Sequence, residues 1–283
     1  MKIRLDKLIE KILLLSSITA IFIVLLIFVF IFIEGLPVIK KFGLLHFLAG
    51  THWNPGENTY GLLPMLIGSI YVTIFSLMIG VPMGLGCAIF LAEIAPKSLA
   101  RIIRPIIELL AGIPSVVYGF YGLVVLVPLI RELFGGRGFS VLAGSIVLSI
   151  MILPTIINIS EDSIRAVPRE YREGSFALGA TQWQTIKKVV LPAARSGIIT
   201  AIVLGMGRAI GETMAIILVT GNVALIPTSP LEPVRTLTSN IAIEMGYAAG
   251  DHASALFATG IILFVFIIIL NTLTTLVPRK AGE

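Results

Sequence analysis

Residues 173–192, EGSFALGATQWQTIKKVVLP, form a polar segment between two long apolar stretches. Glu173 is followed six positions later by Gly179 and ten positions after that by Val189, and Leu191-Pro192 closes the run. Glycine adopts backbone conformations that other residues avoid, so we expect a change of helix direction at Gly179. The pattern predicts a loop of short helices over about residues 160–196.

The composition of the rest of the chain indicates a membrane protein. Hydrophobic residues make up 57% of the 283 residues and only 13% are charged, against about 25% charged residues in soluble domains. A helix needs about 20 apolar residues to cross a bilayer. The stretches of that kind are 12–33, 66–92, 105–130, 141–159, 197–221 and 253–277. We predict an all-α, polytopic protein with six transmembrane helices and a single membrane domain over residues 1–283.

The basic residues are distributed unequally between the two sides that these six spans define. Fifteen fall on the side of the two termini and of residues 173–192, and five fall on the other side. The positive-inside tendency therefore places both termini and the polar loop in the cytoplasm of a cell-membrane protein. The longest outward loop is then about residues 222–252. The net charge of +5 reflects this topology rather than nucleic-acid binding, because no basic stripe is interleaved with aromatic residues.

The sequence predicts no cofactor, no metal site and no catalytic residue. Cys87 is the single cysteine, and the three histidines are scattered in or near the outward loops, where we interpret them as surface residues. No G-x-x-x-x-G-K-[ST] loop for nucleotide phosphates is present. If ATP powers this protein, a different chain must bind it.

Arg208 and Glu212 are ionisable residues inside the predicted span 197–221. Four positions apart on one helix, their side chains are expected to share a face. Ionisable groups at membrane depth are costly and usually face a bundle interior or a water-filled path. An arginine can direct two donors onto a tetrahedral oxyanion and stays charged at any relevant pH. We favour a substrate path over a purely structural ion pair.

Two further features lie in the predicted third span. Glu108 is another candidate for the path, or a cap of its helix near the cytoplasmic end. The run Ile113-Pro114-Ser115 is expected to break the span. The backbone groups that a proline frees need partners, and we interpret this break as part of the pathway lining.

The segment 173–192 resembles the E-A-A, three residues, G, nine residues, I-x-L-P loop of ABC importer permeases. Its opening triplet reads Glu-Gly-Ser and Val189 replaces the isoleucine. The resemblance implies the fold of a type I ABC importer permease and a loop that couples to an ATPase. The coupling residues that it implies are Glu173, Gly179, Ala180, Thr181, Val189, Leu191 and Pro192.

Three other segments are similar to those of phosphate ABC importer permeases, in particular to their C-type subunit. They are GMGRAIGETMAIILVTGN at 205–222, GIPSVVYG at 112–119, and WNP at 53–55 with YGLLP at 60–64. The resemblance implies a role of Arg208 and Glu212 in phosphate passage. It also implies a second permease subunit, a dimer of ABC ATPases and an extracytoplasmic phosphate-binding protein as partners in the bilayer.

We therefore interpret the chain as a permease subunit that passes inorganic phosphate inward and is not itself an enzyme. A permease for sulfate or molybdate is one alternative, because these anions are also tetrahedral and such a chain would share the loop. A secondary transporter or channel that needs no ATPase is the other, and it would lack the pattern of residues 173–192.

Overall fold

The computed structural model describes the backbone of residues 2–275 and the side chains of residues 9–272. The last two residues of the predicted span 253–277, and the basic residues Arg279 and Lys280, lie outside this part. In chain order the elements are α1 (Lys2–Phe42), α2 (Leu44–Ala49), β1 (Trp53–Asn54), η1 (Pro55–Glu57), β2 (Thr59–Tyr60), α3 (Leu63–Ile89), η2 (Phe90–Ile94), α4 (Lys97–Gly112), α5 (Ser115–Tyr121), η3 (Gly122–Leu126), α6 (Val127–Phe134), α7 (Val141–Arg165), α8 (Arg169–Ala177), α9 (Gln182–Thr185), η4 (Ile186–Val190), α10 (Leu191–Ala193), α11 (Arg195–Gly211), α12 (Met214–Val219), α13 (Leu237–Glu244) and α14 (Asp251–Thr275). The segments η2, η3 and η4 are π-helical turns and η1 is a 3-10 turn.

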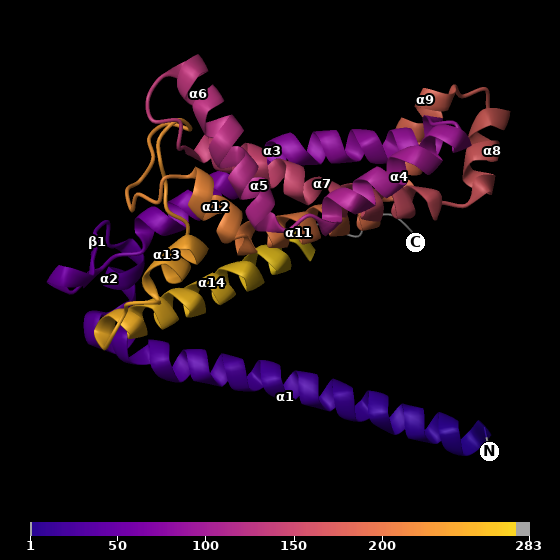
Figure 1. Cartoon of the computed structure of the whole chain (residues 1–283). Coiled ribbons are helices and arrows are strands. Elements are labelled where there is room, and N and C mark those ends of the chain that lie inside the picture. The colour runs from indigo at the N-terminus through magenta and orange to yellow at the C-terminus, as the bar shows by residue number, and fades with distance from the viewer. Residues whose placement is uncertain (1, 276–283) are drawn as a thin grey trace.

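The described part of the chain is an elongated helical bundle (Figure 1). Five of its helices are long and apolar enough to cross a membrane, or six if one bent pair of helices is counted as a span. The five are Ile9–Phe42, Leu63–Ile94, Ser115–Phe134, Val141–Arg165 and Asp251–Thr272. The bent pair joins Gln182–Ala193 to Arg195–Gly211 at an angle of 70°. The prediction of an all-α, polytopic membrane protein is confirmed.

The centre of the bundle is the packing of α3, α7 and α11. Gly80 and Gly84 of α3 face α7, where a Cβ on Gly84 would lie 2.7 Å from the side chain of Ile156. Small residues let two membrane helices approach closely, so these glycines set the spacing of α3 and α7. The largest buried apolar cluster lies beside this contact and continues into α12 through Ile216 and Val219.

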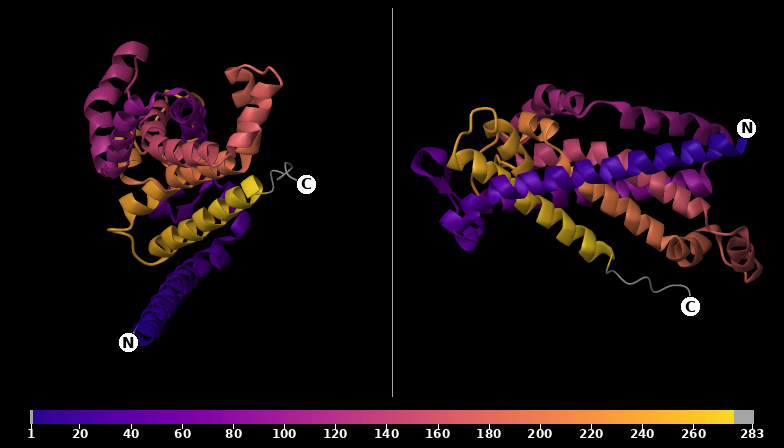
Figure 2. Two further views of the ribbon diagram at one scale, coloured as in Figure 1. Left: turned by 90° about the vertical axis from the view of Figure 1, so that its right-hand side faces the viewer. Right: turned by 90° about the horizontal axis from the view of Figure 1, so that it is seen from below.

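Helix α1 packs mainly on α14 and leans away from the rest of the bundle (Figures 1 and 2). Phe28 contacts Phe264 with 5.0 Å between ring centroids, and Phe30 contacts Phe257 at 5.4 Å. Lys41 forms an ion pair with Asp251 at the end of this contact. Most of the large apolar side chains between Ile9 and Ile33 of α1 are exposed, which is typical of a helix that lies in a membrane.

The predicted third span, 105–130, is wrong in its boundaries. Helix α4 ends at Gly112, Ile113 and Pro114 are extended, and the apolar span begins at Ser115. Proline disfavours the helical conformation of the residue before it, and Ile113 accordingly has a ψ of 127°. Hydropathy alone merged two helices that the proline separates. The predicted break at Ile113-Pro114-Ser115 is confirmed.

The end of the molecule opposite α8 and α9 is held together by one buried carboxylate, that of Glu244. It accepts hydrogen bonds from Trp53 Nε1 at 2.8 Å and Arg235 at 2.6 Å, and it lies 2.8 Å from His252 Nε2. These partners come from the β1–β2 hairpin, the segment before α13 and the start of α14. The side chain of His252 is only 12% exposed, so our interpretation of it as a surface residue is wrong.

Replacing Glu244 with alanine should destabilise this end of the molecule strongly. The change leaves Arg235 buried without its carboxylate, and breaking a buried ion pair in this way costs about 3 kcal/mol. The measurement is the melting temperature of the purified protein in detergent. Glu57→Ala is the matched control, because Glu57 is exposed on the same hairpin and makes no hydrogen bond among the described residues. Equal melting temperatures for the two variants would contradict the role of Glu244.

Candidate functional site

The coupling loop, residues 160–196, contains a series of short helices, as predicted. Helix α8 follows Pro168, and the chain then reverses at Gly179, which has a φ of 80°. A positive φ suits glycine and few other residues. Helix α9 begins with a capping box, in which the side chains of Thr181 and Gln184 each accept the backbone N–H of the other residue. The predicted change of direction at Gly179 is confirmed.

One face of the coupling loop exposes large apolar side chains. Leu178 is 90% exposed and Trp183 is 60% exposed, and Tyr171 and Phe176 are exposed as well. Beside them lies a groove of about 410 Å³, lined by Tyr171, Ser175, Leu178, Gly179, Ala180, Gln184, Lys188 and Val189. Exposed apolar patches of this kind are typical of surfaces that bind another protein. The sequence pattern missed the four large side chains because its fixed positions are the glycine and the residues at its two ends.

The seven residues predicted for coupling are divided between this groove, the open surface and the interior. Three of them line the groove: Gly179, Ala180 and Val189. Three others are exposed outside it: Glu173, Thr181 and Pro192. Leu191 instead packs on a buried cluster that includes Ile164 of α7 and Val190. Leu191 therefore anchors the loop, whereas the other six are accessible to a partner.

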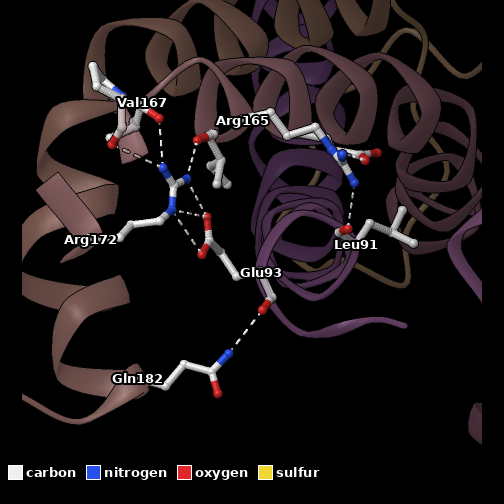
Figure 3. A network of polar contacts seen from close by, with 9 residues as sticks. Leu91, Glu93, Arg165, Val167, Arg172 and Gln182 are labelled. Atoms are coloured by element: carbon white, nitrogen blue, oxygen red, sulfur yellow. Dashed lines mark hydrogen bonds and ion pairs between the residues drawn. The ribbon is translucent and has the colours of Figure 1, made fainter. Parts of the chain in front are cut away.

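A polar network joins the inner face of the coupling loop to the end of α3 (Figure 3). Arg172 of α8 places Nη2 2.6 Å from a carboxylate oxygen of Glu93 in η2. Gln182 of α9 donates to the backbone carbonyl of Glu93 at 2.9 Å. Sequence reasoning missed Glu93 and Arg172, since they lie 79 positions apart and belong to no common motif.

Arg208 and Glu212 lie at the end of a helix, not inside one continuous span. Helix α11 ends at Gly211, and Glu212 is its C-cap residue, with a ψ of 132°. The predicted continuous span 197–221 is interrupted there. The carboxylate of Glu212 accepts the backbone N–H of Ala215 at 3.1 Å and thus caps the first turn of α12. Among the described residues Arg208 and Glu212 form no ion pair.

The two interruptions of the helices, one between α4 and α5 and one between α11 and α12, are followed by helices that pack against each other. Helix α5, which follows the break at Pro114, packs against α12, which follows the break at Glu212 (Figure 1). Gly119 faces Ala215 so closely that a Cβ on it would lie 2.6 Å from the Ala215 Cα. The Tyr118 hydroxyl donates to the Leu110 carbonyl at 2.8 Å. Irregular backbone at membrane depth is found where it is buried in protein or lines a water-filled cavity.

Arg208 lies far along α11 from its first residue, and its positive charge has no carboxylate partner among the described residues. It is 13 residues beyond Arg195, the first residue of α11, or roughly 20 Å along the helix at about 1.5 Å per residue. Its side chain is exposed and makes no hydrogen bond or ion pair within residues 9–272. Glu108 is likewise exposed and unpaired in that part of the chain. It does not cap α4, which ends four residues later at Gly112.

Comparisons with known proteins place this arrangement among transport proteins. The family model described as binding-protein-dependent transport system inner membrane component matches residues 80–282. A probable ABC transporter permease of Bacillus subtilis, YqgH, is 46% identical over 87% of this chain and 84% of its own length. The phosphate transport system permease protein PstC of Haemophilus influenzae is 38% identical over 87% of this chain and 84% of its own. PstC of Xylella fastidiosa is also 38% identical, over 84% and 81%.

Solved structures share the fold at lower identity. The inward-facing MetNI methionine ABC transporter matches with a TM-score of 0.61 and 20% identity, over 82% of this chain and 100% of the other. A bacterial ABC transporter for the import of alginate matches with a TM-score of 0.64 and 18% identity, over 98% and 100%. The arrangement of the passes is therefore common to these transporters, although their sequences have diverged.

Replacing Gly179 with valine should loosen the coupling loop without any steric clash. No atom lies within 4 Å of a Cβ built on Gly179, so the effect comes from the positive φ, which costs other residues about 1–2 kcal/mol. We expect faster hydrogen–deuterium exchange over residues 169–190. Gly179→Asn should have a smaller effect, because asparagine tolerates this conformation better.

Gly174→Ala is the control for this change. Gly174 lies inside α8, also has no atom within 4 Å of a built Cβ, and has helical rather than positive φ. Alanine there should leave exchange unchanged or slow it, because alanine favours a helix over glycine by about 1 kcal/mol. Identical exchange in Gly179→Val and the unchanged protein would show that the turn does not depend on glycine.

Proposed function

The chain belongs to the family of binding-protein-dependent transport system inner membrane components, and on this premise we propose that it is a permease subunit of an ATP-driven importer of inorganic phosphate. It is a multi-pass membrane protein with the fold of type I ABC importer permeases. Its relatives are permeases, which are not themselves enzymes. ATP hydrolysis is assigned to a partner chain.

The observation that carries the proposal is Arg208. A guanidinium without a carboxylate partner in the described chain lies beside the meeting point of two broken passes. Phosphate presents several oxygens to such a group, and arginine can donate two parallel hydrogen bonds to it. The relatives named as phosphate transport permeases support the same substrate. Glu212 holds the start of α12 next to this charge, and we assign it a supporting role in the path.

The exposure of Arg208 also supports a second permease subunit. A charge at membrane depth is unfavourable against lipid and is found facing other protein or water. We propose that a partner permease covers this face and that the anion passes between the two subunits. The end of the molecule with the hairpin and α13 would then receive an extracytoplasmic phosphate-binding protein.

The coupling loop supports a docking site for an ABC ATPase dimer. Its exposed apolar side chains and groove offer the contact surface, and the partly buried Leu191 packs it against the bundle. The start of α1 lies at the same end of the molecule as α8 and α9, and α14 runs toward that end (Figures 1 and 2). Together with the excess of basic residues there, this supports a cytoplasmic position for the loop and both termini.

In this proposal the ATPases drive the permease between outward-facing and inward-facing states. Binding of ATP favours the state in which the ATPase dimer is closed, and hydrolysis favours the other. Such a switch requires a ligand that binds the two states with different affinity. The coupling loop is the part of this chain that would sense the difference.

Reconstitution of the chain tests the assignment directly. The purified chain alone in vesicles should take up no phosphate with ATP, because it has no nucleotide motif and only half of the proposed pathway. Vesicles that also contain the second permease, the ATPase and the binding protein should show ATP-dependent uptake. An excess of sulfate or molybdate should not compete. Uptake by the single chain would contradict the proposal, and strong competition would reassign the substrate.

Arg208→Gln should reduce phosphate uptake by the complete complex about 10- to 100-fold. The change keeps a polar side chain but removes a charged donor, and hydrogen bonds to charged groups contribute about 1.5–3 kcal/mol. Arg208→Lys should restore only part of the activity, since a point charge lacks the planar fork. Uptake is measured with radiolabelled phosphate in complexes of matched subunit composition.

Arg137→Gln is the control, because Arg137 is an exposed arginine outside the coupling loop whose side chain also lacks a hydrogen bond in the described residues. It should transport normally. The double variant Arg208→Gln with Glu212→Gln separates the substrate role from a structural one. If the two residues only neutralised each other, the double variant would recover; a substrate role predicts that it stays inactive.

A further inference from the structure

We propose that Glu93 and Arg172 form a joint that transmits ATP-driven movement of the coupling loop to α3 and α7. The inference rests on the proposed function and adds two positioning residues that contact neither phosphate nor ATP. It assigns the joint to the ion pair shown in Figure 3, on the inner face of the loop.

The ion pair itself is close and shielded. Nε of Arg172 lies 3.2 Å and 3.3 Å from the two carboxylate oxygens of Glu93, and Nη2 lies 2.6 Å from one of them. The side chains are 18% and 11% exposed. Two donors of a planar guanidinium on one carboxylate fix orientation as well as distance.

The same guanidinium also holds the end of α7. Nη1 donates to the carbonyl of Val167 at 2.6 Å and Nη2 donates to that of Ile164 at 2.9 Å. The last carbonyls of a helix have no partner within the helix, and a cation there is favourable. Arg172 therefore connects α8 to the end of α3 and to the end of α7 through one rigid group.

The end of α3 is built to be held in this way. Glu93 lies in the π-helical turn η2, and its backbone carbonyl accepts the side-chain amide of Gln182 at 2.9 Å. About one turn beyond the end of α3, side chains of both α8 and α9 thus bind the same residue. Arg165 of α7 also donates to the Leu91 carbonyl in this turn, at 2.9 Å.

From α7 the contacts continue toward the broken passes. Glu161 accepts from Arg165 at 2.8 Å and from Arg104 of α4 at 2.6 Å, and it is nearly buried. Helix α4 leads without interruption to the break at Pro114, after which α5 packs against α12. A displacement of the coupling loop would reach the pathway through ion pairs and continuous helices.

The ion pair of Glu93 and Arg172 is not needed to attach the coupling loop to the bundle. The loop is already fixed by an apolar cluster that joins Val190, Leu191 and Ala194 to Ala88 of α3 and Ile164 of α7. A buried ion pair adds little net stability compared with apolar packing, whereas it fixes the relative orientation of its elements. The geometry therefore points to transmission rather than attachment.

The test uses the complete complex with its second permease, ATPase and binding protein in vesicles. Glu93→Gln and Arg172→Gln should each retain the ATPase in the purified complex but lower the phosphate imported per ATP at least tenfold. Stimulation of ATP hydrolysis by the phosphate-loaded binding protein should fall to the same extent. Because both changes break one joint, the double variant should lose no more than either single variant.

Arg101→Gln and Glu132→Gln are the matched controls. Both residues lie outside the coupling loop, on α4 and α6, are exposed, and make no hydrogen bond or ion pair within the described part of the chain. They should couple normally. A normal amount of phosphate imported per ATP by Glu93→Gln, or additive losses in the double variant, would contradict the proposed joint.

Two milder changes keep the inference testable if Glu93→Gln does not assemble. Arg172→Lys keeps the charge but loses the fork, and Gln182→Ala removes one hydrogen bond from an exposed residue. Each should lower import per ATP severalfold in an assembled complex, and normal values in both would overturn the joint. Failure of the unchanged complex to import phosphate would instead count against the proposed function.

Discussion

A helix that stops inside a membrane leaves backbone N–H and C=O groups that no water can reach, and this constraint organises the centre of the molecule. Two helices end in the centre of the molecule, α4 at Gly112 and α11 at Gly211. Neighbouring groups supply the missing partners: the Tyr118 hydroxyl donates to a carbonyl at the end of α4, and the Glu212 carboxylate accepts an N–H at the start of α12. Since each break needs protein around it, the two lie together where α5 meets α12.

The distribution of charge follows from the same constraint. Within the described side chains the ion pairs gather at the two ends of the bundle, around Glu93 and Glu161 at one end and Glu244 at the other. Arg208 lies between these ends and makes none. An arginine that is paired with a carboxylate attracts an anion weakly, whereas an unpaired guanidinium attracts it strongly. An unpaired charge in the middle of a membrane would be unfavourable against lipid. The unpaired state of Arg208 is thus informative in itself.

Sequence reasoning recovered the features that depend on local chemistry. The six passes follow from apolar length, the reversal at Gly179 from a glycine, and the break at Pro114 from a missing N–H. It failed where the structure is decided by distant neighbours. Nothing in an apolar run predicts that Glu212 leaves the helix, because its conformation is fixed by a cap on α12 and by Thr238, which donates to its carbonyl. Likewise, the pairing of Glu93 with Arg172 depends on the docking of α8 against α3.

In the proposed mechanism the coupling loop acts on a path that lies at a distance from it. The ends of the bundle are held by ion pairs and packed apolar clusters, so they move as units, whereas the breaks at Pro114 and Glu212 lack a continuous hydrogen-bond ladder. Helix α4 leads toward the break at Pro114, with Arg104 held by Glu161 at its middle and the break at its end. In the proposed mechanism a movement of the coupling loop would therefore reach the break at Pro114 through α4.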